Sequence, residues 1–163
     1  MKNAGTVIPA FSVSCMSKSL FFCKFAFCAC GGVYWGSENH RGGVGMILQT
    51  GFRTDIPAFY SEWFVNRLRA GYVLVRNPYN PQAVTRYELN PDMVDLIGFC
   101  TKNPAPMLPK MDLLRSYGQY WFVTITPYGP EIEPHVPPKE TVLCDFVALS
   151  EIVGPDSIGW RYD

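Results

Sequence analysis

Charged and amide side chains stand where the apolar runs of this chain end, and side chains of these types can hold an anion. The segments concerned are Arg53-Thr54-Asp55, Arg76-Asn77, Lys102-Asn103, Thr126 and Arg161-Tyr162-Asp163. Arginine binds a carboxylate or a phosphate through two parallel hydrogen bonds, and lysine supplies a compact charge. Cations outnumber carboxylates in this set, so the surplus of positive charge predicts a site for an anionic small molecule.

These charges could instead pair with one another and serve only the structure. The pairings that the sequence suggests are Arg53 with Asp163 and Arg161 with Asp55. One charged strand end would need no ligand to explain it. Four cations at the same edge of a sheet favour a binding site, because removing each charge from water costs several kcal/mol. These four are Arg53, Arg76, Lys102 and Arg161.

The elements that would position these residues alternate between strands and helices from Met46 onward. Strands are predicted near 47–50, 72–75, 94–99, 119–125 and 157–160, with a short extra strand over 84–89, and helices over 61–70, 107–117 and 139–153. Such alternation predicts right-handed βαβ units and a parallel sheet, whose strands all end at one edge. We therefore expect an α/β fold, a partial (β/α) barrel of about five main strands, with its site on the C-terminal rim.

The composition and the missing motifs exclude several other classes. Apolar residues make up 48% of the chain and charged residues 17%, which is too apolar for a disordered tail and too charged for a membrane bundle. A formal net charge of zero argues against nucleic acid as the main partner. Neither G-x-G-x-x-G nor G-x-x-x-x-G-K-[ST] occurs, so a dinucleotide site and a P-loop would lack their phosphate cradle.

Residues 1–45 differ in character from the rest of the chain. They contain four of the six cysteines (Cys15, Cys23, Cys28 and Cys30), in a spacing that matches no common metal site. Lys24 interrupts their apolar stretch, which disfavours a membrane span or a signal peptide. We expect an irregular leader, rich in cysteine and aromatic residues, that extends a domain covering 46–163. Without a secretion signal, cytoplasmic location and reduced cysteines are the default expectation.

Several other noticeable side chains are predicted to lie outside the site. They are His135, Glu131 and Glu133 in an exposed proline-rich loop, Cys100 and Cys144 as small core residues, and Trp63, Trp121 and Trp160 as core or barrel-wall aromatics. A lone histidine in a loop usually faces solvent. A cysteine within an apolar strand or helix usually packs as a small hydrophobic residue.

Five motifs of the chain resemble a known bacterial family in their order and spacing. They are Met46-Ile47-Leu48 leading into Arg53-Thr54-Asp55-Ile56-Pro57, Gly71-Tyr72-Val73-Leu74-Val75-Arg76-Asn77-Pro78, Thr101-Lys102-Asn103-Pro104, Thr126-Pro127-Tyr128-Gly129, and Trp160-Arg161-Tyr162-Asp163. From Met46 to Asp163 the sequence is similar to the domain of unknown function 1848. Two local departures from the usual family pattern stand out: Gly51-Phe52 replaces Ser-Arg, and Cys100 replaces tryptophan.

The resemblance implies a radical S-adenosylmethionine-like barrel of which this chain is the N-terminal half. Longer members of the family carry a C-terminal cysteine cluster that suggests an iron–sulfur centre. By this resemblance, the full-length family would use an iron–sulfur cluster and S-adenosylmethionine, whereas this chain would contain no cofactor and no metal ligand. The half-barrel would also leave unpaired sheet edges, through which the chain could self-associate.

Three functions remain open from the sequence. The first is a fragment of an enzyme that binds an anionic small molecule, either S-adenosylmethionine or a substrate, at the rim of the barrel. The second is a non-catalytic domain that binds an anion there or serves a structural purpose. The third is a truncated product with no function of its own.

Overall fold

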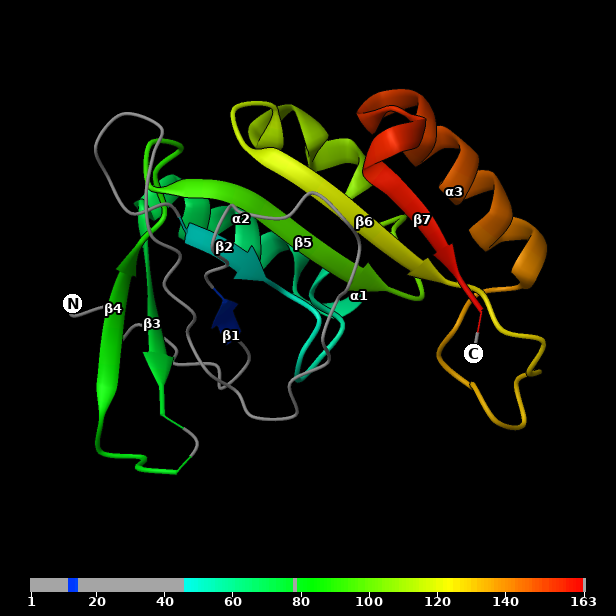
Figure 1. Ribbon diagram of the computed structural model, residues 1–163. Helices are drawn as coiled ribbons and strands as arrows, with labels where there is room; N and C mark the ends of the chain where they lie inside the picture. Colours follow the sequence, from blue (N-terminus) through cyan, green and yellow to red (C-terminus); the bar gives the residue numbers. More distant parts are fainter. Residues whose placement is uncertain (1–11, 15–45, 78, 163) are drawn as a thin grey trace, which may run out of the picture.

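A computed structural model of the chain describes residues 12–14, 46–77 and 79–162 (Figure 1). Its main sheet has the strand order β1-β2-β5-β6-β7. These strands span Ser12–Ser14 (β1), Met46–Gln49 (β2), Val94–Thr101 (β5), Gly118–Thr124 (β6) and Ile158–Arg161 (β7). The last four run parallel to one another, and β1 pairs antiparallel with β2. The predicted leader, residues 1–45, otherwise lies outside the described residues.

Helices connect the parallel strands, as the alternating pattern predicted. They span Ile56–Phe59 (α1), Ser61–Ala70 (α2) and Lys139–Val153 (α3), with 3-10 turns at Leu108–Leu114 and Pro155–Ser157. Both predicted helices at 61–70 and 139–153 are confirmed, whereas the helix predicted over 107–117 is a shorter 3-10 turn. Gly71 ends α2 with a left-handed backbone (φ 75°), a conformation that glycine adopts without strain.

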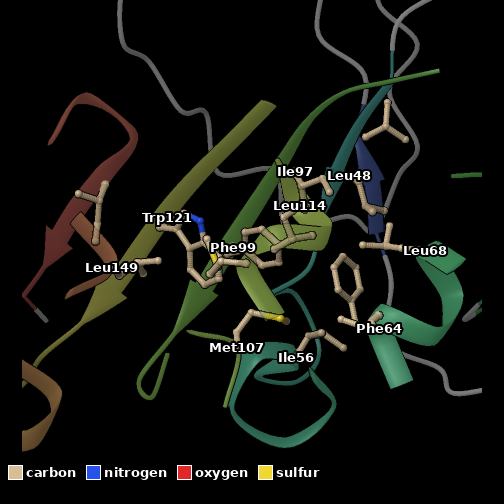
Figure 2. Close-up of a cluster of buried hydrophobic side chains, with 14 of the residues drawn as sticks. Leu48, Ile56, Phe64, Leu68, Ile97, Phe99, Met107, Leu114, Trp121 and Leu149 are labelled. Carbon is tan, nitrogen blue, oxygen red and sulfur yellow. The ribbon is translucent and has the colours of Figure 1, made fainter. Parts of the chain in front are cut away.

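The hydrophobic core lies between one face of the main sheet and the helices (Figure 2). Phe99 of β5 stacks on Trp121 of β6 with ring centroids 3.9 Å apart, and Phe64 of α2 meets Phe99 edge-on at 5.6 Å. All three side chains are fully buried. Aromatic pairs in these geometries add to the free energy gained from burial, so this packing fixes β5 and β6 against α2.

The strand predicted at 72–75 does not join the parallel sheet, which corrects the sequence-based topology. Tyr72–Arg76 (β3) pairs antiparallel with Val84–Glu88 (β4) in a separate two-stranded sheet, a hairpin that Figure 1 shows apart from the main strands. The predicted extra strand at 84–89 is confirmed as β4. β4 follows β3 closely along the chain, and this explains why the two strands pair with each other, because strands joined by a short loop pair most readily as a hairpin.

The architecture of the described residues is therefore α/β, with a four-stranded parallel sheet. Closure of that sheet into a barrel stays a prediction. None of the helices in the described part of the chain is both long enough and apolar enough to cross a membrane.

Strand β7 is an outer strand of the main sheet among the described residues, and it offers a test of self-association. Its Trp160, predicted to be a core or barrel-wall aromatic, is 59% exposed and so does not belong to the core. We expect the chain to self-associate in sedimentation experiments and W160K to shift it toward monomer, because a charge on an edge strand opposes edge-to-edge pairing. L143K on α3, where Leu143 is 42% exposed, is the matched control and should leave the distribution unchanged. Equal sedimentation of wild type and W160K would contradict this.

Candidate functional site

A pocket of about 310 Å³ opens at the C-terminal ends of the parallel strands. It is lined by Gly51, Asp55, Ala58, Phe59, Cys100, Thr101, Lys102, Asn103, Thr124, His135, Val136 and Arg161. The lining comes from the loop after β2, the end of β5, the end of β6, the end of β7 and the proline-rich loop before α3. Parallel strands place their C-terminal ends at one edge, which is why residues so distant in sequence meet here.

Four of the predicted site residues line this pocket, namely Asp55, Lys102, Asn103 and Arg161. The register of β6 and β7 pairs Thr124 with Arg161, so both residues reach the same wall of the pocket. The neighbouring backbone fixes this arrangement, because Ile125 N–H donates to the Arg161 carbonyl at 3.0 Å.

The other predicted site residues fall elsewhere. Arg76 and Asn77 are exposed on the separate hairpin, where the Asn77 side chain accepts from the backbone N–H groups of Tyr79 and Asn80. The prediction that they share the edge with the main strands is therefore wrong, for the topological reason given above. Arg53 and Thr54 lie in the loop after β2 but do not line the pocket, and Asp163 lies outside the described residues.

Asp55 joins the first loop to the end of β5. One carboxylate oxygen accepts from Ala58 N–H at 2.9 Å and so caps α1, and the other accepts from Lys102 N–H at 2.7 Å. Burial raises the pKa of Asp55 above its ordinary value, although the two backbone N–H groups, the Thr101 hydroxyl and the Lys102 charge oppose this shift. Asp55 therefore holds the pocket wall together by joining the start of α1 to the end of β5.

Substitution of Asp55 tests this duty. D55A should lower the free energy of unfolding by about 2 kcal/mol or more, because it removes a helix cap and leaves the Lys102 N–H without its acceptor. Denaturant unfolding measures the change. D112A is the control, because the Asp112 side chain is 83% exposed in a surface pair with Arg115 and should matter little. Equal losses in the two variants would contradict the role of Asp55.

Glu133 forms a three-way contact behind the pocket, and the prediction that it is an exposed loop residue is wrong. Its carboxylate accepts from Lys102 Nζ, from Lys139 Nζ at 3.0 Å and from Thr126 Oγ1 at 2.7 Å. Only 11% of the side chain is exposed. The cations and the hydroxyl stabilise the ionised form and lower the pKa of Glu133 to about 2, although burial opposes the shift.

This contact also explains where Thr126 and the proline-rich loop lie. Thr126 is buried and faces Glu133, so it supports the pocket without lining it. His135 and Val136 follow Glu133 in the loop and form part of the pocket lining. His135 was predicted to lie outside the site. The proline-rich composition of its loop does not indicate that the histidine reaches the pocket. The contact partners of Glu133 come from the end of β5 and the start of α3, which no local pattern reveals.

Cys100 lies at the end of β5 and lines the pocket, so its prediction as a core residue is only partly right. The side chain is half-buried, its Sγ accepts from Gln49 Nε2 at 3.2 Å, and burial raises the pKa of the thiol. Gly51 passes so close that a Cβ at position 51 would lie 2.3 Å from the Cys100 Cβ. Glycine at 51 is what allows the first loop to approach β5. Cys144, also predicted in the core, is exposed on α3.

Comparison with known protein families places this geometry in context. A family model described as domain of unknown function (DUF1848) matches residues 47–163, more than two thirds of the chain. The chain belongs to the DUF1848 family. Every residue that lines the pocket falls within the matched range. Neither the curated proteins nor the solved structures contain a significant match to the chain.

Among residues 12–14, 46–77 and 79–162 of this DUF1848 domain, no group of three or more histidine, cysteine, aspartate or glutamate side chains is placed to hold a metal ion. These residues by themselves do not supply the ligand set of an iron–sulfur centre.

The low pKa of Glu133 predicts how the stability of the DUF1848 domain depends on pH. A carboxylate whose pKa is about 2 in the fold and 4.5 ordinarily stabilises the fold fully above pH 4.5. That contribution fades as the pH falls toward 2. We expect E133Q to cost about 1–3 kcal/mol near neutral pH, and the deficit to shrink progressively below pH 4.5.

Unfolding of both proteins at a series of pH values measures this difference. E131Q is the matched control, because Glu131 is exposed in the same loop. A deficit in E133Q that stays constant from pH 7 to pH 2 would contradict the assignment.

Proposed function

We propose that this DUF1848 domain binds an anionic small molecule in the pocket at the C-terminal edge of its parallel sheet. The observation that supports this most is the meeting of Lys102 and Arg161, 59 positions apart in the numbering, around one cavity. Arginine and lysine are the side chains that hold carboxylates and phosphates in proteins. In open α/β sheets, ligands bind at the C-terminal ends of the strands.

The electrostatics of the lining favour an anion over a cation. Asp55 is the acidic residue of the lining, and its two oxygens already accept backbone N–H groups. Its raised pKa also reflects burial that disfavours the charged form. The lining also contains the two cationic residues Lys102 and Arg161. A ligand with a carboxylate or a phosphate would meet net positive charge here.

The remaining lining supplies directional contacts of the kind that select one ligand among several. The hydroxyl group of Thr124, the amide of Asn103 and the imidazole of His135 can each form hydrogen bonds with a bound molecule, whereas the Thr101 hydroxyl is already engaged by Asp55 and by the Asn103 N–H. Phe59 and Val136 add apolar surface. A volume of about 310 Å³ lies within the range of small-molecule sites.

The chemistry that follows binding is proposed from the family resemblance alone. In that proposal the domain is part of a radical S-adenosylmethionine-like barrel, and the carboxylate of S-adenosylmethionine, or of a substrate, is the anion bound. The alternative is a domain that binds an anion without catalysis. Titration of a full-length relative with S-adenosylmethionine separates the two, because cleavage of the cofactor favours an enzyme and heat release without turnover favours binding alone.

Removal of the pocket charges tests the binding proposal. R161Q should weaken binding of inorganic phosphate about tenfold, the loss expected when a charge-assisted hydrogen bond of about 1.4 kcal/mol disappears. K102Q should also weaken binding. Titrations at fixed ionic strength, followed by phosphorus NMR, measure the dissociation constant.

R115Q is the matched control for these titrations. Arg115 is an exposed arginine at the end of the 3-10 turn, outside the pocket, so this variant loses the same charge without losing a pocket contact. It should bind phosphate as the wild type does. Equal affinity in wild type, R161Q and R115Q would contradict the proposed site, and so would an absence of phosphate binding in all of them.

A further inference from the structure

Lys102 belongs to two structures at once, the pocket lining and the Glu133 contact. The residue lines the cavity, and its ammonium group donates to the Glu133 carboxylate. A bound anion would need the same ammonium group. Glu133 is itself a carboxylate, which is the chemical group that the pocket is proposed to recognise.

The loop that carries Glu133 is also a wall of the pocket. Glu133 is contacted by Lys102 from the end of β5, by Lys139 from α3 and by Thr126 after β6. Two and three positions further on, His135 and Val136 line the cavity. Release of the Glu133 carboxylate would therefore loosen the wall and free the ammonium group of Lys102 in one step.

The backbone of the loop is held by short-range hydrogen bonds, and Val136 packs against the core. The backbone N–H groups of Ile132 and Glu133 both donate to the Gly129 carbonyl, at 3.1 and 2.9 Å. Tyr128 and Ile132 expose large apolar side chains to solvent. A segment whose hydrogen bonds are local and whose side chains are largely exposed opens at low cost once its anchor is released, and its amides then exchange faster.

We propose that Glu133 is an internal competitor for the anion, so that a ligand binds Lys102 by displacing the Glu133 carboxylate and releasing the loop 127–138. The inference rests on the proposed function, because it assumes that the pocket binds an anion. Glu133 then sets the affinity of the site. Two partners that compete for one group lower each other's apparent affinity by the same factor.

Phosphate titration of the full 163-residue chain tests the competition. E133Q keeps the size of the side chain but removes its charge, so Lys102 and Lys139 both become available to the ligand. We expect E133Q to bind inorganic phosphate about tenfold more tightly than the wild type, within the range typical of coupled sites. E131Q, which removes a charge from an exposed position of the same loop, should bind as the wild type does. Equal or weaker binding by E133Q would overturn the proposal.

Hydrogen exchange in the wild-type protein gives a second test that does not depend on the folding of a variant. Displacement of Glu133 should speed exchange of the amides of Ile132, Glu133 and Val136 when phosphate is added, because their loop hydrogen bonds lose their anchor. Slower exchange of these amides on phosphate addition would show that the loop closes on the ligand, and would overturn the proposal.

The two proposals fail in different ways. If no phosphate binds to the wild type or to E133Q, the proposed function is wrong, and so is the competition that depends on it. If phosphate binds and R161Q weakens that binding, but E133Q gives no gain, the site survives and only the competition is wrong.

Discussion

Parallel pairing of β2, β5, β6 and β7 is the constraint on which the pocket depends. Because these strands share a direction, the loop after β2 and the ends of β5, β6 and β7 reach one edge of the sheet. The register then decides which residues meet there, as in the pairing of Thr124 with Arg161. A shift of one residue would turn each of these side chains to the opposite face. The buried stack of Phe99 on Trp121 holds β5 and β6 in their register, since both rings occupy the same core.

The sequence predicts the helices and strands of this fold better than it predicts which strands pair with one another. The predicted helix at 139–153 matches α3, and the predicted strands at 94–99 and 119–125 match β5 and β6 to within two residues at each end. Periodicity and end signals are local, so they can be read from the chain directly. Pairing is not local. Tyr72–Arg76 has the composition of a buried parallel strand, but it pairs with β4, which follows it closely along the chain.

The same distinction explains which site residues could be predicted. Asp55, Lys102, Asn103 and Arg161 follow strands that join the parallel sheet, so the argument from strand ends places them correctly. Arg76 follows a strand of the hairpin, and the argument fails for that reason alone. Glu133 could not be identified, because its loop looks like an exposed acidic turn. The lysines that bury its carboxylate come from other elements and become neighbours only in the fold.

Gly51 and Cys100 lie together in the pocket wall, where the first loop approaches β5. A Cβ at position 51 would lie 2.3 Å from the Cys100 Cβ, so the loop and the strand can approach this closely only with glycine at 51. A larger side chain at position 100 would add bulk at the same wall. The two residues therefore set both the spacing of the first loop from β5 and the room left beside Lys102, so a substitution at either position has to be interpreted together with the other.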